Sequence, residues 1–242
     1  MTPVRWRATA VIAVLALLSL TGCQTRAGTA AFVGSSRITD DQVRQLAQQG
    51  LGVKAVSTTV AGNVGGYRQL ILGRLLKHVV IAGAARKLGV SVSDGQIDQA
   101  VSSAAPNAAG RTQLDATLAA DPYRLPPSEL RPVFRDIISL SEIGKRLRPD
   151  ATISNAEALK FYDDNGGPAS GQSFAQLKPQ VLQAIQSQRA EQYVVHYLRT
   201  NKVTINPRYG RFDPAKLFDR NQAVPIVAAR DDLVRDSAST RG

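Results

Sequence analysis

The residue best placed to do chemistry is Cys23, the only cysteine among 242 residues. It directly follows Leu20-Thr21-Gly22, at the end of an apolar run over residues 8–20 that is preceded by Arg5 and Arg7. This run is shorter than the about 20 residues needed to cross a bilayer core. The basic start, the short apolar run and the small residues predict a secretory signal peptide over residues 1–22. The Cys23 thiol is then the nucleophile that a diacylglycerol transferase needs, so Cys23 is the predicted lipidation site.

The segment Leu20-Thr21-Gly22-Cys23 resembles the bacterial lipobox. The resemblance implies that cleavage makes Cys23 the first residue, and that it carries diacylglycerol and a third acyl chain of the palmitate type. Each buried methylene contributes about 0.8 kcal/mol, and more than one chain is needed for stable anchoring. The alternative is an ordinary signal peptide with an incidental cysteine. Small polar residues follow, so residues 23–29 are predicted to be a tether.

No other group of residues has the spacing of a reactive site. His78 and His196 lie inside apolar helical patterns without a carboxylate or second histidine at ligand spacing, so both are predicted to be packing or surface residues. The acidic pairs at 40–41 and 163–164 fit helix ends, and the glycines of 62–66 lack the lysine and hydroxyl residue of a phosphate loop. The sequence therefore predicts no catalytic residue, no metal site and no cofactor, and a protein that is not an enzyme.

The chain is strongly basic, with a net charge of +11. Loss of residues 1–22 removes Arg5 and Arg7 and lowers this charge by two. Because the remaining charge is diffuse and export is predicted, we expect no nucleic-acid partner. The excess positive charge either attracts anionic lipid headgroups and envelope polymers, or it only makes the protein surface basic and soluble.

Helix signals dominate the rest of the chain and predict a mainly α fold. Thr39 with Gln42, Ser93 with Gln96, Ser154 with Glu157 and Ser173 with Gln176 each have the spacing of a capping box. The periodicity of apolar residues predicts helices starting at residue 39, over 66–88, 94–105 and 112–120, from 128 to the residue before Pro149, and over 156–164 and 174–201. Residues 50–66 are expected to form a glycine-rich loop. Strands over 30–33 and 203–205 are expected to pair as a two-stranded β element that joins the chain ends, and residues 208–242 to form a poorly ordered tail.

The order of these elements resembles the N-terminal domain of the SurA and PrsA envelope chaperones. The resemblance rests on the stretch from Lys87-Leu88-Gly89 to Ser93-Asp94, on Ile153-Ser154-Asn155-Ala156-Glu157 and on Phe161-Tyr162-Asp163-Asp164-Asn165. It covers residues 30–207. It implies a SurA N-terminal-like helical domain with a long central helix and a returning C-terminal helix.

One departure from this family bears on function. In the relatives a prolyl isomerase (parvulin) domain of roughly a hundred residues separates the two halves, whereas here only residues 166–172 join them, too few for a sheet and a proline pocket. The resemblance and the lipid anchor imply a holdase on the extracytoplasmic face of the cell membrane. It would bind unfolded exported polypeptides without isomerase activity, at a peptide-binding site that the sequence does not identify. The alternative is a lipid-anchored helical scaffold that binds one specific envelope protein.

Overall fold

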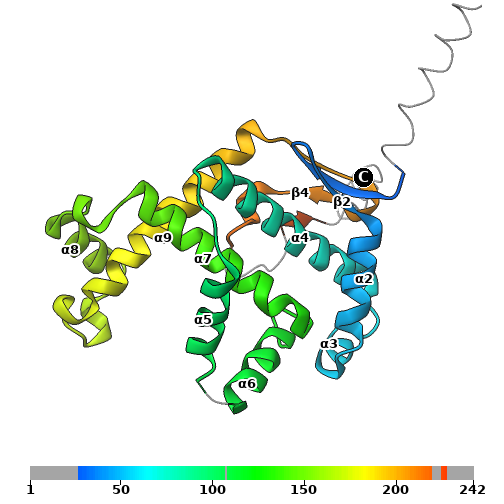
Figure 1. Cartoon of the computed structure of the whole chain (residues 1–242), viewed down its shortest axis with the longest axis horizontal. Coiled ribbons are helices and arrows are strands. Elements are labelled where there is room, and N and C mark those ends of the chain that lie inside the picture. The colour runs from blue at the N-terminus through cyan, green and yellow to red at the C-terminus, as the bar shows by residue number, and fades with distance from the viewer. Residues whose placement is uncertain (1–26, 107, 220–224, 228–242) are drawn as a thin grey trace, which may run out of the picture.

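A computed structural model of the chain describes residues 27–106, 108–219 and 225–227 (Figure 1). Cys23 and the predicted signal peptide lie outside these residues. The elements, in chain order, are β1 (Thr29–Val33), β2 (Ser36–Thr39), α2 (Asp40–Leu51), α3 (Lys54–Thr59), α4 (Val64–Lys87), α5 (Asp94–Ala104), α6 (Ala108–Ala119), η1 (Pro127–Glu129), α7 (Leu130–Leu147), η2 (Asp150–Thr152), α8 (Asn155–Asp164), η3 (Pro168–Ser170), α9 (Phe174–Thr200), β3 (Val203–Ile205), η4 (Pro207–Tyr209), β4 (Arg211–Phe212), η5 (Pro214–Lys216) and β5 (Ile226–Val227). The mainly helical prediction is confirmed.

A three-stranded antiparallel sheet with the order β2-β1-β3 joins the two ends of the helical part. The predicted pairing of the first and last strands is confirmed, with Phe32 opposite Thr204 and Val33 opposite Val203. The prediction of only two strands is wrong, because β2 forms a hairpin with β1. Gly34 has a φ of +57°, which lets the chain turn back tightly, and Ile38 of β2 is then buried. Ile38 is the one buried residue of this four-residue strand, and so short a pattern does not predict a strand from the sequence.

The predicted capping boxes begin the helices where expected. The side chains of Thr39, Ser93 and Ser173 each accept from the backbone of the residue three positions on, whose glutamine side chain accepts from the cap in return. Ser154 caps α8 in one direction only, by accepting from the Glu157 backbone. Each cap satisfies amides at a helix start, and its loss typically costs about 1 kcal/mol. Local sequence therefore fixes the starts of four helices.

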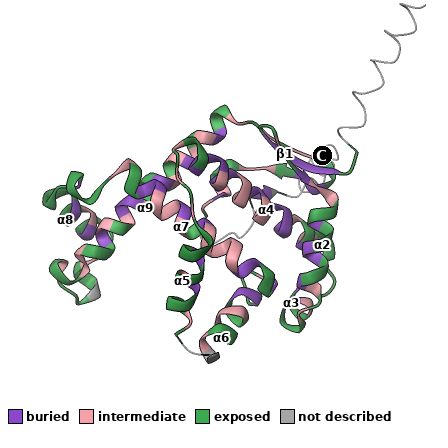
Figure 2. Cartoon of the chain, in the orientation of Figure 1, coloured by how far each residue is buried: buried purple, intermediate pink, exposed green. Residues whose placement is uncertain are grey.

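Helix α4 is the centre of the fold, and α2, α7 and α9 pack around it (Figures 1 and 2). Leu72, Leu76, Val80 and Ile81 on this helix are 0% exposed. A helix that is apolar on nearly all sides must be covered by other elements. Burying each such side chain contributes about 1.5–3 kcal/mol. The fold is therefore organised around α4, as the sequence predicts for residues 66–88.

Helix α9 links the main core to a smaller apolar cluster with α8. Its Val194 belongs to the main core, whereas Val181 and Ile185 pack against Ala158 and Tyr162 of α8. Helix α7 crosses α9 closely at Gly144, where a Cβ atom would lie 2.5 Å from the backbone oxygen of Gln186. Only glycine fits this crossing, so the two long helices approach with backbone near backbone.

The glycine-rich segment over residues 50–66 is not wholly a loop, contrary to the prediction. It contains the short helix α3 and the first residues of α4. Val56 of α3 is 0% exposed, and this tertiary contact stabilises a segment whose local propensity is low. Gly50 is required by packing, because a Cβ atom there would lie 1.8 Å from the hydroxyl oxygen of Tyr67.

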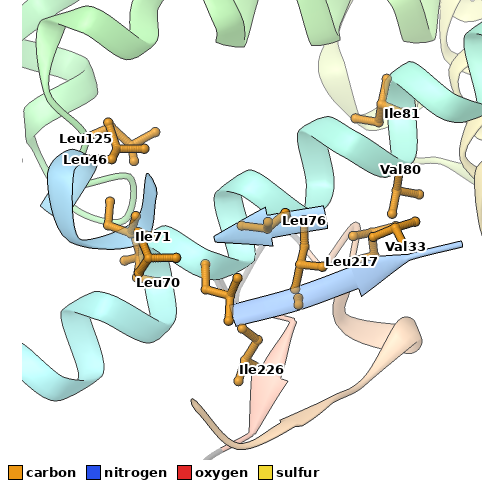
Figure 3. Packing of buried hydrophobic residues seen from close by; sticks show 14 of the residues in the cluster. Val33, Leu46, Leu70, Ile71, Leu76, Val80, Ile81, Leu125, Leu217 and Ile226 are labelled. Atoms are coloured by element: carbon orange, nitrogen blue, oxygen red, sulfur yellow. The ribbon is translucent and has the colours of Figure 1, made fainter. Parts of the chain in front are cut away.

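The prediction of a poorly ordered tail from residue 208 is wrong for the part that the structure describes. Strands β4 and β5 pair, and the backbone N–H of Asp213 donates to the oxygen of Pro225 at 2.8 Å. Tyr209, Leu217 and Ile226 are buried, and Figure 3 shows the latter two among the core side chains. These residues follow no helix or strand period, so only their tertiary contacts reveal that they belong to the core.

Candidate functional site

A cavity of about 610 Å³ opens between α4, α6, α7 and the residues that follow η5. We call it the apolar groove. Its size falls within the about 300–1,000 Å³ of typical ligand pockets. Most of its walls are aliphatic or aromatic side chains. The apolar lining residues are Leu70, Ile81, Leu114, Leu118, Pro122, Tyr123, Leu125, Leu130, Val133, Phe134, Ile137, Leu140, Leu217 and Phe218.

The rim of the apolar groove carries large hydrophobic side chains that are open to solvent. Tyr123 is 52% exposed and Ile137 is 55% exposed. In the described part of the chain, Val64 and Leu159 are the other large hydrophobic residues with this degree of exposure, and neither lines the groove. Exposed apolar surface of this kind, gathered beside a cavity, is typical of a site that binds an apolar partner.

A buried charge cluster lies at the α4–α7 boundary, and two of its members, Arg74 and Asp136, line the groove. Arg74 of α4 donates from Nη1 to Asp136 of α7 at 2.5 Å, and its Nε lies 3.0 Å from Glu129 Oε2. The Nδ1 atom of His78 lies 2.7 Å from the other carboxylate oxygen of Asp136. The side chains of Arg74, Glu129 and Asp136 are between 9% and 11% exposed. We call these four residues the Arg74 cluster.

Helical geometry explains how the Arg74 cluster forms. Arg74 and His78 are four positions apart on α4, so their side chains lie on one face and both reach Asp136. Burial of such charges is costly, and the cost is offset only when each is paired. The cluster therefore holds α4 and α7 in one relative position, and these two helices form walls of the groove.

Tyr67 of α4 anchors the chain next to the rim residue Tyr123. Its hydroxyl donates to the backbone oxygen of Arg124 at 2.9 Å, directly beside Tyr123. Burial, assisted by the negative charge of Glu129, raises the pKa of Tyr67 to about 12. The phenol therefore stays protonated at physiological pH and keeps donating this hydrogen bond, which fixes the segment between α6 and η1.

Lys77 supplies a cation at the wall of the groove. Burial lowers the pKa of its ammonium group, Arg74 lowers it further, and the carboxylates of Asp136 and Glu191 partly offset this. The Nζ atom lies 5.1 Å from the ring centroid of Phe218, in the geometry of a cation–π contact.

The two histidines, His78 and His196, lie in different surroundings. His196 of α9 is exposed, as predicted. No carboxylate lies at ligand spacing from His78 in the sequence, and the structure brings Asp136 to it from 58 residues away. Within the described residues, the hydrogen bond of His78 is made to Asp136. The pair orients an imidazole and joins two helices.

The acidic pairs lie at helix ends. Asp40 begins α2, where it accepts from the Tyr209 hydroxyl at 3.1 Å and pairs with Arg208. Asp164 ends α8 and pairs with Lys160 at 2.8 Å. Within residues 27–106, 108–219 and 225–227, no group of three or more His, Cys, Asp or Glu side chains could hold a metal ion.

A second large cavity lies between α7 and α9, with a volume of about 860 Å³. Polar and charged side chains line much of it, among them Lys145, Asp150, Lys178 and Gln186. Gln186 is buried there and donates to the backbone oxygen of Arg148 at 2.9 Å. An apolar partner would have to desolvate these groups, so the apolar groove is the better candidate site.

No helix in the part of the chain that the structure describes is both long enough and apolar enough to cross a membrane. Comparison of the chain with models of known protein families and with curated proteins gave no match.

Proposed function

We propose that the protein is a chaperone of the holdase type, anchored by lipid to the extracytoplasmic face of the cell membrane, that binds unfolded exported polypeptides. The observation that carries this proposal is the apolar groove with Tyr123 and Ile137 exposed at its rim. Unfolded chains expose apolar side chains, and covering them contributes about 25 cal/mol per Å². Ordering of the client opposes this gain, so the resulting binding is weak and unselective.

The resemblance to the SurA and PrsA N-terminal domain supports the same proposal. Helix α8 and helix α9 are joined directly through η3, where the relatives carry an isomerase domain. The Tyr162 hydroxyl donates to the backbone oxygen of Gln172 at 2.6 Å, which closes this short connection. We therefore propose a chaperone without prolyl isomerase activity.

Suppression of aggregation tests the proposal. The full chain in lipid nanodiscs should suppress light scattering by denatured, reduced lysozyme at a near-stoichiometric ratio, because each groove shields one apolar segment. Empty nanodiscs are the control and should have no effect. Scattering that is unchanged at a severalfold excess of the protein would reject the holdase. That outcome would leave the dedicated scaffold as the alternative.

The lipid anchor is proposed from the sequence around Cys23. Replacement of Cys23 with serine removes the thiol that carries the lipid, so the protein should move from the membrane fraction to the soluble extracytoplasmic fraction. Fractionation followed by immunoblotting measures this. A Cys23→Ser variant that stays in the membrane fraction would mean that another feature anchors the chain.

A further inference from the structure

Part of the apolar groove is covered by the chain itself. Residues 214–219, which we call the C-terminal plug, leave β4 through η5 and bring Leu217 and Phe218 to the groove wall. Leu217 is 2% exposed and packs in the main core with residues of α4 (Figure 3). Phe218 is only half-buried and lies beside Lys77. The plug thus places an aliphatic and an aromatic side chain in a cavity that also contains open volume.

Few backbone contacts hold the plug in place. The Asp213 side chain accepts from the Ala215 backbone at 3.0 Å, and the backbone N–H groups of Leu217 and Asp219 donate within the plug at 3.3 Å. These bonds are local to the plug and do not tie it to α4 or α7. Among the described residues, side-chain contacts that dock the plug include Leu217 in the main core, Phe218 against Lys77, and the packing of η5 against α9. Another apolar segment can compete for side-chain contacts of this kind when the plug opens locally.

We propose that the groove recognises a leucine followed by an aromatic residue, and that the C-terminal plug, in which these two residues follow the 3-10 helix η5, is a built-in copy of this segment that competes with clients. This inference rests on the proposed function for the identity of the groove as a client site. The partner class follows from the two side chains that already occupy the groove. The Lys77 ammonium favours an aromatic ring at the second position, because it contacts the Phe218 ring face.

A peptide with the sequence of residues 213–219, Asp-Pro-Ala-Lys-Leu-Phe-Asp, tests the proposal. Phe218→Ser removes the aromatic ring from the plug, so the plug is held less tightly in the groove and competes less with the peptide. The fluorescein-labelled peptide should therefore bind the full-length Phe218→Ser variant on the order of tenfold more tightly than the wild type, because the competing ring is gone. Fluorescence anisotropy measures both dissociation constants.

Two controls make the result specific. A peptide in which the leucine and the phenylalanine are both serine should gain nothing from Phe218→Ser. The Phe161→Ser variant removes a phenylalanine that packs partly buried against the smaller cluster, away from the groove, and should bind the first peptide as the wild type does. Equal affinity of wild type and Phe218→Ser, or an equal gain for the serine peptide, would overturn the proposal.

Hydrogen exchange on the wild type gives a second readout that needs no variant. Saturating reduced, carboxymethylated lysozyme should speed exchange at the backbone N–H groups of residues 215–219, because the bound client displaces the plug and exposes these groups to solvent. Unchanged exchange with client bound would overturn the proposal and leave the holdase standing. Conversely, a chain that fails to suppress aggregation but shows the tenfold gain in peptide affinity would reject the holdase and keep the plug.

Discussion

Replacing Arg74 with methionine should lower the free energy of unfolding by about 3–5 kcal/mol, the usual cost of breaking one side of a buried ion pair. Arg74 is the cation that faces both Asp136 and Glu129 at the α4–α7 boundary. Methionine preserves most of the apolar stem, so packing changes little. It removes the cation that Asp136 and Glu129 share, and of these two nearly buried carboxylates His78 contacts only Asp136. The lost energy is therefore mainly electrostatic.

Chemical denaturation followed by circular dichroism measures this effect. Arg131→Met is the matched control, because Arg131 pairs with Asp98 and Asp94 on the surface, where its side chain is 43% exposed. An exposed pair contributes about 1 kcal/mol or less, so this variant should unfold close to the wild type. If Arg74→Met also unfolds at the wild-type denaturant concentration, the Arg74 cluster does not hold the two helices together.

Local signals made most of the helices predictable. A capping box needs only residues three positions apart, and the long apolar run of α4 shows its own period, so both are visible in a short window of sequence. Pairing of β1 with β3 was also predictable, because two short apolar strands flank the helical part and have few other partners. These features depend on neighbouring residues or on a single plausible pairing.

Features that depend on distant residues were not predictable from the sequence. Asp136 is 62 residues from Arg74 and 58 from His78, so no spacing rule links them. Leu217 and Ile226 are buried only because β4 and β5 return the chain to α4. The apolar groove itself combines residues from α4, α6, α7 and the plug. The helical periodicity shows that these faces are apolar, but the tertiary fold decides which of them are left partly open.

Removing the apolar rim should weaken client binding more than any change outside the groove. In the double variant Tyr123→Ser with Ile137→Ser, the two exposed large hydrophobic side chains of the groove lose their apolar surface. Truncating a contact residue of this kind costs more than about 1 kcal/mol, and each 1.4 kcal/mol is a factor of ten in affinity. We therefore expect the dissociation constant for an unfolded client to rise by on the order of tenfold or more. Stability should change little, because both side chains are already half in solvent.

The matched control is the double variant Val64→Ser with Leu159→Ser, which removes 41% and 44% exposed hydrophobic residues that lie outside the groove. The deciding measurement is a fluorescence anisotropy titration of labelled, reduced and carboxymethylated lysozyme with the wild type and both double variants. If the apolar groove binds unfolded chains, the Tyr123 and Ile137 double variant should bind the labelled lysozyme at least about tenfold more weakly than the wild type. The control double variant should bind it as tightly as the wild type does. Equal weakening in both variants, or none in the first, would contradict a client site in the apolar groove.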